Sequence, residues 1–317
     1  MDDQLVHEIG ELIRHSQKIV ITTHLRPDGD AIGSMLGLGL SLQSSGKDIQ
    51  MVLNDMVPAS LRHLEGSKQI IQEVNGAFDI SITVDCSDIQ RVGSAIKNTS
   101  QVDVNVDHHP TNENFGKFNL IETSASATAE ILAEYLPLWG LPITKDVASA
   151  LLTGLITDTI GFRTSSVTSR TMRSAATLID CGVEISDLYL RSLILRSFES
   201  VRFWGAGLSQ IERQGPIVWT KLTIQDRKQA GYSGRDDADL INVLSSIKDA
   251  SIAIIFVEQS SSRVKVSWRA QPGLDVARLA MQFGGGGHAA AAGAELEGDM
   301  EEVMSRVLDQ TQGLLVN

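Results

Sequence analysis

The chain has 317 residues, of which 42% are hydrophobic, an ordinary fraction for a globular protein. A chain of this length suits two domains, each large enough to bury a core. Its formal net charge of −12 at pH 7 argues against binding to long nucleic acids, although acidity also serves plain solubility and that interpretation has equal weight. The two cysteines are far apart, the first residues are polar and no long apolar run occurs, so we expect a cytoplasmic protein without a membrane segment.

The first apolar run ends in a group of metal-binding residue types. Residues 18–23 are mostly β-branched and apolar, as expected of a buried strand, and His24 follows directly. Asp28 and Asp30 come next in a turn that contains Gly29, so two carboxylates one residue apart can face two different ions. The alternative is that both carboxylates only cap the helix that begins near residue 31.

Three later elements end in the same kinds of residue. Strand-like runs over 81–84 and 102–106 and a buried helix over 148–157 are followed by potential ligands, which are Asp85, Asp107, His108, His109 and Asp158. The carboxyl ends of parallel strands meet at one edge of a sheet, so these side chains can converge on a pair of ions. Helix capping does not explain the histidines, and the combined pattern predicts a two-metal phosphoesterase site.

The donor types indicate which ions the site would prefer. Oxygen and imidazole donors without a thiolate favour Mn²⁺ or Mg²⁺ over a structural zinc ion, and the histidines favour Mn²⁺. Cys86 is the one thiol close to these residues in the sequence. In a strand its side chain would point away from that of Asp85, so we expect a buried apolar residue and not a ligand.

Strand-like and helical runs alternate up to about residue 190. Besides the runs above, this part predicts a strand at 48–53 and helices at 32–42, 128–139 and 168–179. Such alternation is typical of an α/β domain with a doubly wound parallel sheet. Residues 188–211 look helical and predict a connector, packed either against its own domains or against the second subunit of a homodimer. We therefore predict a metal-binding catalytic domain at 1–190, a connector at 191–215 and a smaller α/β domain at 216–317.

The smaller domain contains a glycine-rich segment. Its predicted elements form a small sheet with helices, the strands at 217–222, 252–257 and 264–268 and the helices at 238–247, 276–283 and 301–314. Four glycines at 284–287 precede His288 and four alanines. We interpret the glycines either as a hinge or packing seam, or as a loop that approaches an anionic ligand at the amino end of a following helix. No Walker-type lysine accompanies them.

Five motifs together resemble those of one enzyme family: HLRPDGDAIGS, VDCSD, VDHHP, GLITDT and GGGGHAAAAG. They follow the order of the DHH phosphoesterase superfamily and span essentially the whole chain. Within that superfamily the chain is similar to the bacterial nanoRNase/pAp phosphatases, which degrade very short oligoribonucleotides and remove the 3′-phosphate from adenosine 3′,5′-bisphosphate (pAp). The resemblance implies a phosphoester hydrolase that uses two divalent metal ions.

The resemblance also implies a role for each metal-binding residue. One ion would be held by His24, Asp28 and Asp85, and the other by Asp30, Asp85, His108 and Asp158, so that Asp85 bridges them. Asp107 would support the ligands, and His109 would contact the scissile phosphate. The catalytic group then comprises Asp85, Asp107, His108 and His109, with a metal-activated water as the nucleophile.

Substrate contacts are expected mainly in the smaller domain. Residues 267–270 resemble the family's substrate-binding strand, which favours nucleotide binding by Arg269, Gly285, Gly286, Gly287 and His288. Arg163 is a further candidate, with a surface salt bridge as an equal alternative. The family pattern has a glycine directly after the Asp-Thr pair of its last metal motif, where this chain has Ile160.

These considerations predict short single-stranded RNA, pAp and similar nucleotides as partners, and neither long nucleic acid nor membrane. The alternatives are a phosphodiesterase for linear dinucleotides, an inorganic pyrophosphatase of the family II type, a RecJ-like exonuclease and a nucleotide-sensing binding protein. The glycine and alanine segment speaks against the pyrophosphatase, and the acidity of the chain speaks against the exonuclease. The complete set of ligand-type residues speaks against a pure sensor.

Overall fold

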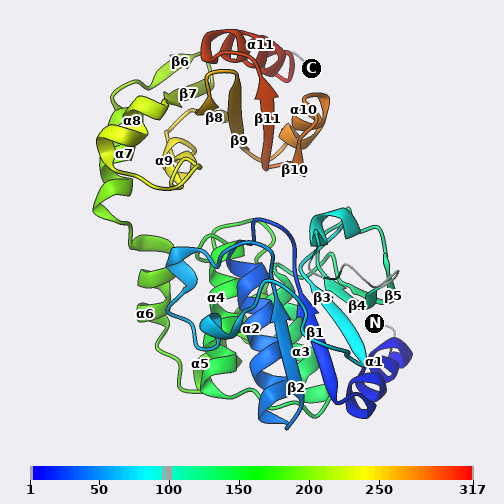
Figure 1. Cartoon of the computed structure of the whole chain (residues 1–317). Coiled ribbons are helices and arrows are strands. Elements are labelled where there is room, and N and C mark those ends of the chain that lie inside the picture. Colours follow the sequence, from blue (N-terminus) through cyan, green and yellow to red (C-terminus); the bar gives the residue numbers. More distant parts are fainter. Residues whose placement is uncertain (1–2, 95, 97–101, 316–317) are drawn as a thin grey trace. The chain divides into compact units, whose positions relative to one another are not determined.

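A computed structural model describes residues 3–94, 96 and 102–315, and the chain divides into two compact units between Leu195 and Arg196 (Figure 1). None of the described helices is both long and apolar enough to span a membrane. The predicted connector at 191–215 and the limits of the two predicted domains stay predictions.

The first unit contains a five-stranded sheet with the strand order β2-β1-β3-β4-β5, and all its strands are parallel. The strands are β1 (Lys18–Thr22), β2 (Asp48–Val52), β3 (Ile80–Val84), β4 (Val102–Asp107) and β5 (Gly116–Ile121). This is a doubly wound order whose direction reverses between β1 and β3, the position at which such sheets bind ligands. The predicted α/β class with a parallel sheet is confirmed; β5 is an addition that the sequence analysis did not identify.

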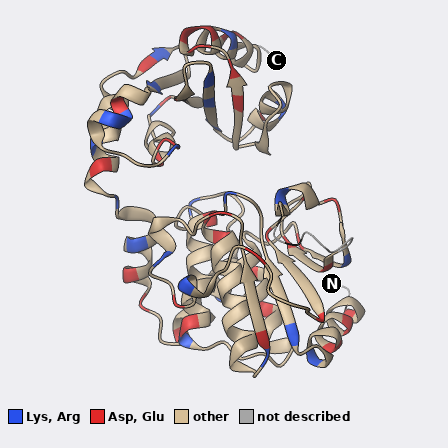
Figure 2. Ribbon diagram, viewed as in Figure 1, with Lys and Arg blue, Asp and Glu red and all other residues tan. Residues whose placement is uncertain are grey.

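Helices of the first unit pack with one face of this sheet in a single apolar core. They are α1 (Asp3–His15), α2 (Gly29–Ser44), α3 (Thr128–Leu138), α4 (Lys145–Asp158), α5 (Ser169–Asp180) and α6 (Ile185–Tyr189). The long helix α2 is almost without charge, with Asp30 in its first turn as the exception (Figure 2). Such a helix, apolar nearly all round, belongs in the interior of a domain.

Glycines bring α2 and α4 unusually close together. A Cβ atom at Gly33 would lie 2.6 Å from the carbonyl oxygen of Ala150, and one at Gly154 would lie 2.8 Å from a carboxylate oxygen of Asp30. Both distances are too short for a methyl group, so the contact requires glycine. As a result, Asp30 at the start of α2 lies near the end of α4, where Asp158 is the last residue.

The second unit is built on a six-stranded mixed sheet with the order β10-β11-β9-β8-β7-β6. The strands are β6 (Glu212–Gln214), β7 (Ile217–Leu222), β8 (Ile252–Ser260), β9 (Arg263–Ala270), β10 (Gly286–His288) and β11 (Ala291–Glu297). The helices are α7 (Phe198–Leu208), α8 (Ile224–Ala230), α9 (Leu240–Leu244), α10 (Val276–Gln282) and α11 (Met300–Gly313). Two separate apolar clusters form on its two faces, one with α10 and α11 and the other with α7, α8 and α9.

Two expectations about local structure are wrong. The segment 188–211 is not one helix, because Leu195 takes an extended conformation between a π-helical turn at Leu190–Ile194 and α7. The residues after the glycine run form a hairpin of β10 and β11 and not a helix. Here every second residue, Ala292, Ala294 and Leu296, is buried against the core, and pairing with β9 favours a strand over the helix that alanine prefers. No helix terminus is therefore available there for an anion.

Candidate functional site

The first group of potential ligands lies where β1 and β3 end. The imidazole Nε2 of His24 is 4.0 Å from Asp28 Oδ1 and 3.7 Å from Asp85 Oδ2. Asp28 also caps α2, since its carboxylate accepts hydrogen bonds from the backbone N–H groups of Asp30 and Ala31 at 3.1 Å. The capping interpretation is therefore correct for Asp28, but it does not compete with metal binding, because the same side chain belongs to a potential metal-binding group.

Asp85 lies between the two groups of potential ligands, with His24 on one side and His108 on the other. It is buried, and its backbone has a φ of 52°, a left-handed conformation that is uncommon for residues other than glycine and often found at functional positions. One carboxylate oxygen, Oδ2, faces His24, while the other, Oδ1, lies 3.7 Å from His108 Nε2. A carboxylate placed in this way offers one oxygen to each of two neighbouring ions.

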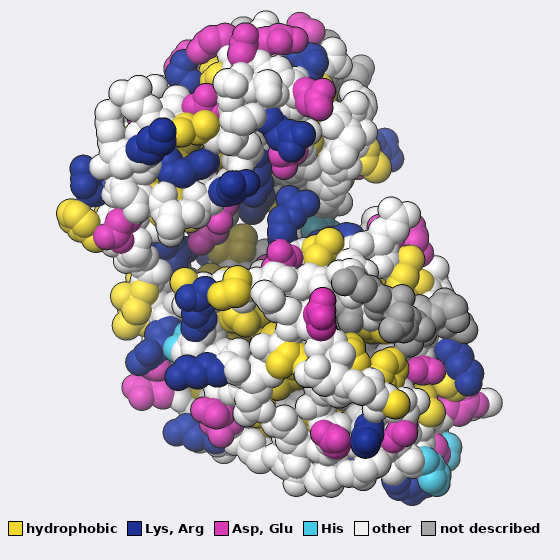
Figure 3. All heavy atoms as spheres, viewed as in Figure 1, with side chains coloured by type: hydrophobic (Ala, Val, Ile, Leu, Met, Phe, Trp, Pro, Cys, Tyr) yellow, Lys and Arg dark blue, Asp and Glu magenta, His cyan; other side chains and the backbone are white. Residues whose placement is uncertain are grey.

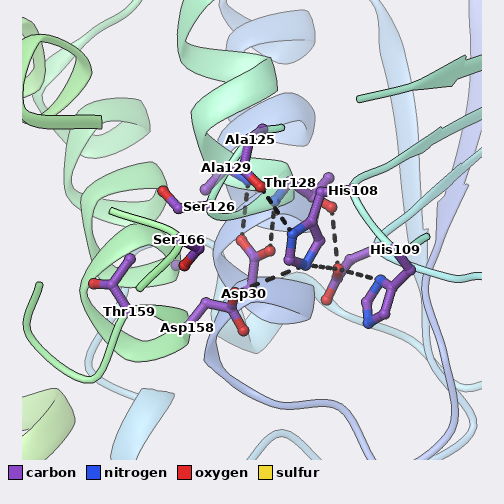
Figure 4. A network of polar contacts seen from close by, with 12 residues as sticks. Asp30, His108, His109, Ala125, Ser126, Thr128, Ala129, Asp158, Thr159 and Ser166 are labelled. Atoms are coloured by element: carbon purple, nitrogen blue, oxygen red, sulfur yellow. Dashed lines mark hydrogen bonds and ion pairs between the residues drawn. The ribbon is translucent and has the colours of Figure 1, made fainter. Parts of the chain in front are cut away.

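The second group combines His108, which follows β4, with residues of α2 and α4 (Figure 4). His108 Nε2 is 3.7 Å from Asp158 Oδ2, and Asp30, His108 and Asp158 form a further potential metal-binding group. Asp30 is buried, and its carboxylate accepts hydrogen bonds from the backbone N–H groups of Thr128 at 2.6 Å and Ala129 at 3.0 Å. His109 offers an alternative donor, because it forms a third potential group with Asp85 and His108.

The donor separations fit metal ions better than direct hydrogen bonds. The nitrogen-to-oxygen distances of 3.6–4.0 Å around Asp85, His24, His108 and His109 are too long for hydrogen bonds. Two ligands on one ion, each at about 2.1 Å, are separated by about 3.0–3.7 Å. Cys86 is in none of the potential groups, and its Sγ is 3.1 Å from the carbonyl oxygen of Asp88. The cluster can therefore bind divalent metal ions through oxygen and imidazole donors.

Backbone carbonyl oxygens orient two of the histidine rings. The Nδ1 atom of His24 is 2.9 Å from the carbonyl oxygen of Leu25, and that of His108 is 3.3 Å from the carbonyl oxygen of Ala125. A carbonyl can only accept, so the contact of His108 places its ring proton on Nδ1 and leaves the lone pair of Nε2 to face the carboxylates. Nδ1 of His24 lies between this kind of acceptor and a donor, the Nη2 atom of Arg91 at 3.2 Å.

The site carries several carboxylates close together, so its charge favours the binding of cations. Burial raises the pKa of Asp158 to about 7, with Asp28 and Asp85 adding to the effect of burial and His108 opposing it. Burial and the negative charges of Asp85 and Asp158 also hold the pKa of Asp30 well above its usual range. Burial by itself would raise the pKa of Asp85, but the contacts of Asp85 with His24, His109 and His108 lower this pKa below its usual value. Bound cations would relieve the repulsion among these carboxylates.

Asp107 is fully buried and holds His109. Its Oδ1 atom lies 2.7 Å from His109 Nδ1, and its Oδ2 atom accepts a hydrogen bond of 2.5 Å from the side chain of Asn112. Burial alone would lower the pKa of His109, but its hydrogen bond to Asp107 and the charges of Asp85, Asp107 and Asp158 raise it to about 9. Asp107 thus occupies a supporting position and favours the protonated form of His109.

Two side chains near the centre were missed by the sequence analysis. Arg91 has an exposed side chain whose Nη2 is 3.2 Å from His24 Nδ1, and Asn112 contacts Asp107 as described. Each lies within seven residues of a metal motif, Arg91 after Asp85 and Asn112 after Asp107, so proximity in sequence was the signal that could have identified them.

In the second unit, Arg269 and His288 lie in one row across the sheet. His288 on β10 pairs with Ala291 on β11, which pairs with Arg269 on β9. Directly paired residues point to the same face, so the two side chains share one surface. The adjacent row on this face consists of Gly286, Gly293 and Ser267, which leaves a floor almost without side chains. Burial lowers the pKa of Arg269, while the carboxylates of Asp237 and Asp239 act in the opposite direction.

The three glycines that were predicted to contact the substrate have two different surroundings. A Cβ at Gly285 would lie 2.2 Å from the carbonyl oxygen of Gly293, and one at Gly287 would lie 2.4 Å from that of Ala291. These two positions are therefore needed for the close packing of β10 on β11, in agreement with a packing seam. A Cβ at Gly286 would meet no atom within 4 Å, so the surface above this residue is open to a ligand.

The turn after Asp158 has a left-handed backbone at three successive residues. The φ angles are 49° at Ile160, 69° at Gly161 and 67° at Phe162. A β-branched residue such as Ile160 is strained in this conformation, which a glycine would adopt without strain. Arg163 follows with an exposed side chain, in the first unit.

Comparisons with known proteins identify the two units. Residues 18–155 match the N-terminal domain of the DHH family, and residues 218–316 match the DHHA1 domain. A bifunctional oligoribonuclease and PAP phosphatase from Thermus thermophilus is 34% identical over 298 residues, which cover 92% of this chain and 88% of the relative. The chain belongs to the DHH family. The resemblance inferred from the sequence motifs is thereby confirmed.

Further similar proteins agree with this assignment. A bifunctional oligoribonuclease and PAP phosphatase from Mycoplasma genitalium is 28% identical over 91% of this chain and 92% of its own length. The crystal structure of an exopolyphosphatase-related protein from Bacteroides fragilis superimposes with a TM-score of 0.91 at 26% identity, covering 99% of this chain and 98% of that one. This DHH protein is therefore similar over nearly its whole length to proteins whose names describe hydrolases of phosphate bonds.

Proposed function

We propose that this DHH protein is a metal-dependent phosphohydrolase that degrades oligoribonucleotides of about two to five residues to nucleoside monophosphates and dephosphorylates pAp. The observation that carries this proposal is Asp85, which directs one carboxylate oxygen to His24 and the other to His108. That arrangement suits two adjacent ions, which is the arrangement that hydrolysis of phosphate esters exploits. The names of the relatives supply the substrate classes.

The proposal assigns the ligands to two ions. His24, Asp28 and Asp85 would hold the first, and Asp30, Asp85, His108 and Asp158 the second. Mn²⁺ is expected in preference to Mg²⁺, because two of the donors are imidazoles. When bound, the ions would supply an activated water and neutralise charge on the reacting phosphate.

The protein residues contribute orientation and positive charge. His109, kept protonated near neutral pH by Asp107, would stabilise the negative charge that develops on the scissile phosphate. Arg269 and His288 would bind the non-scissile phosphate or the terminal nucleotide, since the arginine fork engages phosphate oxygens in pairs. The open backbone at Gly286 lets a ligand approach the same surface. Arg163 is proposed as an additional phosphate contact.

Substrate length tests this proposal directly. An acidic chain offers no long cationic track, so we expect kcat/KM to be highest for RNAs of about two to five residues and to fall steeply beyond that length. The measurement is hydrolysis of 5′-labelled RNAs from dimer to about 24-mer, each at two ionic strengths, with Mn²⁺ present. A rate that rises with length and collapses with salt would instead indicate an exonuclease of the RecJ type.

The same assay separates the remaining alternatives. Alongside the RNA series, it includes pAp, a linear dinucleotide, a long DNA and pyrophosphate. Preference for the linear dinucleotide or for pyrophosphate would reassign the substrate, and binding without turnover of any of them would indicate a nucleotide sensor. A cytoplasmic location and a homodimer remain predictions, for which fractionation and light scattering are the tests.

A further inference from the structure

One short segment contacts ligands from three different elements of the proposed metal centre. This segment, Ala125–Ala129, leads into α3 and contains no proposed ligand itself (Figure 4). We propose that Thr128 in this segment is a positioning residue that sets how Asp85 divides its two oxygens between the ions. The inference rests on the two-metal function proposed above and extends it to a residue outside the ligand set.

Thr128 holds two ligands at once. Its hydroxyl donates a hydrogen bond of 3.0 Å to Asp85 Oδ1, and its backbone N–H donates one of 2.6 Å to Asp30 Oδ2. The hydroxyl bond fixes the rotation of the Asp85 carboxylate, so that Oδ1 stays with His108 and Oδ2 with His24. A carboxylate free to rotate would present the two ions with a mixture of arrangements. The second ion, next to His108, should lose more affinity than the first, because Oδ1 is the oxygen that Thr128 holds.

The rest of the segment adds two contacts of the same kind. The carbonyl oxygen of Ala125 accepts from His108 Nδ1, and the backbone N–H of Ala129 donates to Asp30 at 3.0 Å. The residue at the N-cap position of α3, Ala127, offers no side chain for capping. Asp30 from α2 takes that place, so the start of α3 and the proposed ligand satisfy each other's hydrogen bonds.

A buried polar network makes this segment rigid. Glu130 is fully buried and accepts hydrogen bonds from the backbone N–H and hydroxyl of Ser126, at 2.7 and 2.6 Å, and from Thr171 at 3.3 Å. Arg170 on α5 binds Glu134 and Glu122 alongside. Because a buried carboxylate that lost these donors would be left unsatisfied, the segment has little freedom to move. Contacts from Thr171 and Arg170 on α5 thus help to fix the position of Thr128, and Thr128 in turn fixes the positions of Asp85 and Asp30.

The test compares side chains that differ by the Thr128 hydroxyl. Thr128→Val keeps the shape and the backbone N–H but removes the hydroxyl, and we expect about 10- to 100-fold weaker binding of the second Mn²⁺. Thr128→Ser retains the hydroxyl and should bind Mn²⁺ as the wild type does. The matched control is Thr153→Val, because Thr153 is equally buried but its hydroxyl donates to the carbonyl oxygen of Ser149 within α4 and to no proposed ligand.

Mn²⁺ titration by calorimetry gives the two affinities, and electron paramagnetic resonance shows whether the bound ions form a coupled pair. A merely structural role would lower thermal stability in both Val variants without changing the coupled-pair signal. If Thr128→Val does not fold, Thr128→Ser and Thr128→Ala provide the same comparison of one hydroxyl. Wild-type affinity and spectrum in the hydroxyl-free variant would overturn this inference alone, whereas a wild type that binds no Mn²⁺ would overturn the proposed function as well.

Discussion

In the first unit most of the proposed metal ligands are buried or half-buried, with Asp28 as the exposed exception, whereas in the second unit the proposed substrate contacts are the half-buried Arg269 and the exposed His288 on one face of a sheet. Residues 1–195 contain 14 basic and 24 acidic residues, while residues 196–317 contain 13 and 15, so the acidity is concentrated in the first unit. On the face drawn in Figure 3, Lys and Arg side chains gather on the second unit. The first unit is thus the more strongly acidic one and suits cations, while in the second unit acidic and basic residues nearly balance.

Removal of the shared carboxylate should have the largest effect. We expect Asp85→Asn to lower hydrolysis of every substrate by about three orders of magnitude or more, because both ions lose a ligand and the activated water is lost with them. The matched control is Asp103→Asn on β4, since Asp103 contacts Ser81 and is outside the cluster. Activity with Mn²⁺ and circular dichroism of both variants provide the measurement. Substantial activity in Asp85→Asn would contradict the two-metal assignment.

The substrate surface should respond differently. We expect Arg269→Ala and His288→Ala to lower kcat/KM on nucleotides by about one to three orders of magnitude, the scale of losing a charged phosphate contact. Hydrolysis of bis-p-nitrophenyl phosphate and the Mn²⁺ content should hardly change. Arg263→Ala is the control, because Arg263 is an exposed arginine on the same strand that faces Glu295. Equal losses on nucleotides and on bis-p-nitrophenyl phosphate would contradict the assignment of substrate binding to the second unit and of catalysis to the first.

The unbalanced charge of the first unit should appear in its pH dependence. Asp158 has a pKa raised to about 7, so the metal-free protein binds more protons when folded than when unfolded. Its contribution to stability is therefore present at low pH and is lost as pH rises from about 4 to 7, with a slope of up to about 1.4 kcal/mol per pH unit. His109, whose pKa is raised to about 9, loses its contribution between about pH 6.5 and 9.

Thermal unfolding in the presence of a chelator measures this effect. Asp158→Asn should become progressively more stable than the wild type as pH rises from 5 to 7, after which the difference levels off. Added Mn²⁺ should stabilise the wild type more at pH 8 than at pH 6, because it competes with protons for the carboxylates. If the difference in thermal stability between Asp158→Asn and the wild type does not vary with pH, repulsion among the carboxylates does not destabilise the metal-free protein.

The smallest expected effect concerns the turn after Asp158. We expect Ile160→Gly to raise the free energy of unfolding by at most about 1 kcal/mol, because glycine relieves the left-handed strain but gains freedom in the unfolded chain. Ile160→Ala keeps the Cβ atom and so separates backbone strain from loss of side-chain packing. Urea denaturation of both variants is the measurement. If Ile160→Gly is as unstable as Ile160→Ala, packing of the isoleucine outweighs the strain.

Sequence reasoning succeeded where chemistry and position coincide. His24 and Asp85 are ligand-type residues at the ends of β1 and β3, and the parallel sheet brings them together without further information. Thr128 could not be recognised, because a threonine at the start of a helix is indistinguishable from an ordinary capping residue. The β10–β11 hairpin was missed because four alanines favour a helix locally, and the edge of β9 that overrides this preference is distant in sequence.

The glycine contact between α2 and α4 has a consequence for ion selectivity. Asp30 and Asp158 approach one another only as closely as the two helices do, and that approach is limited by Gly33 and Gly154. A single added methyl group in this seam would widen the cage while leaving every donor atom in the chain. We therefore expect substitutions in this apolar seam, and not only exchanges of ligands, to change whether the proposed site prefers a small or a large cation.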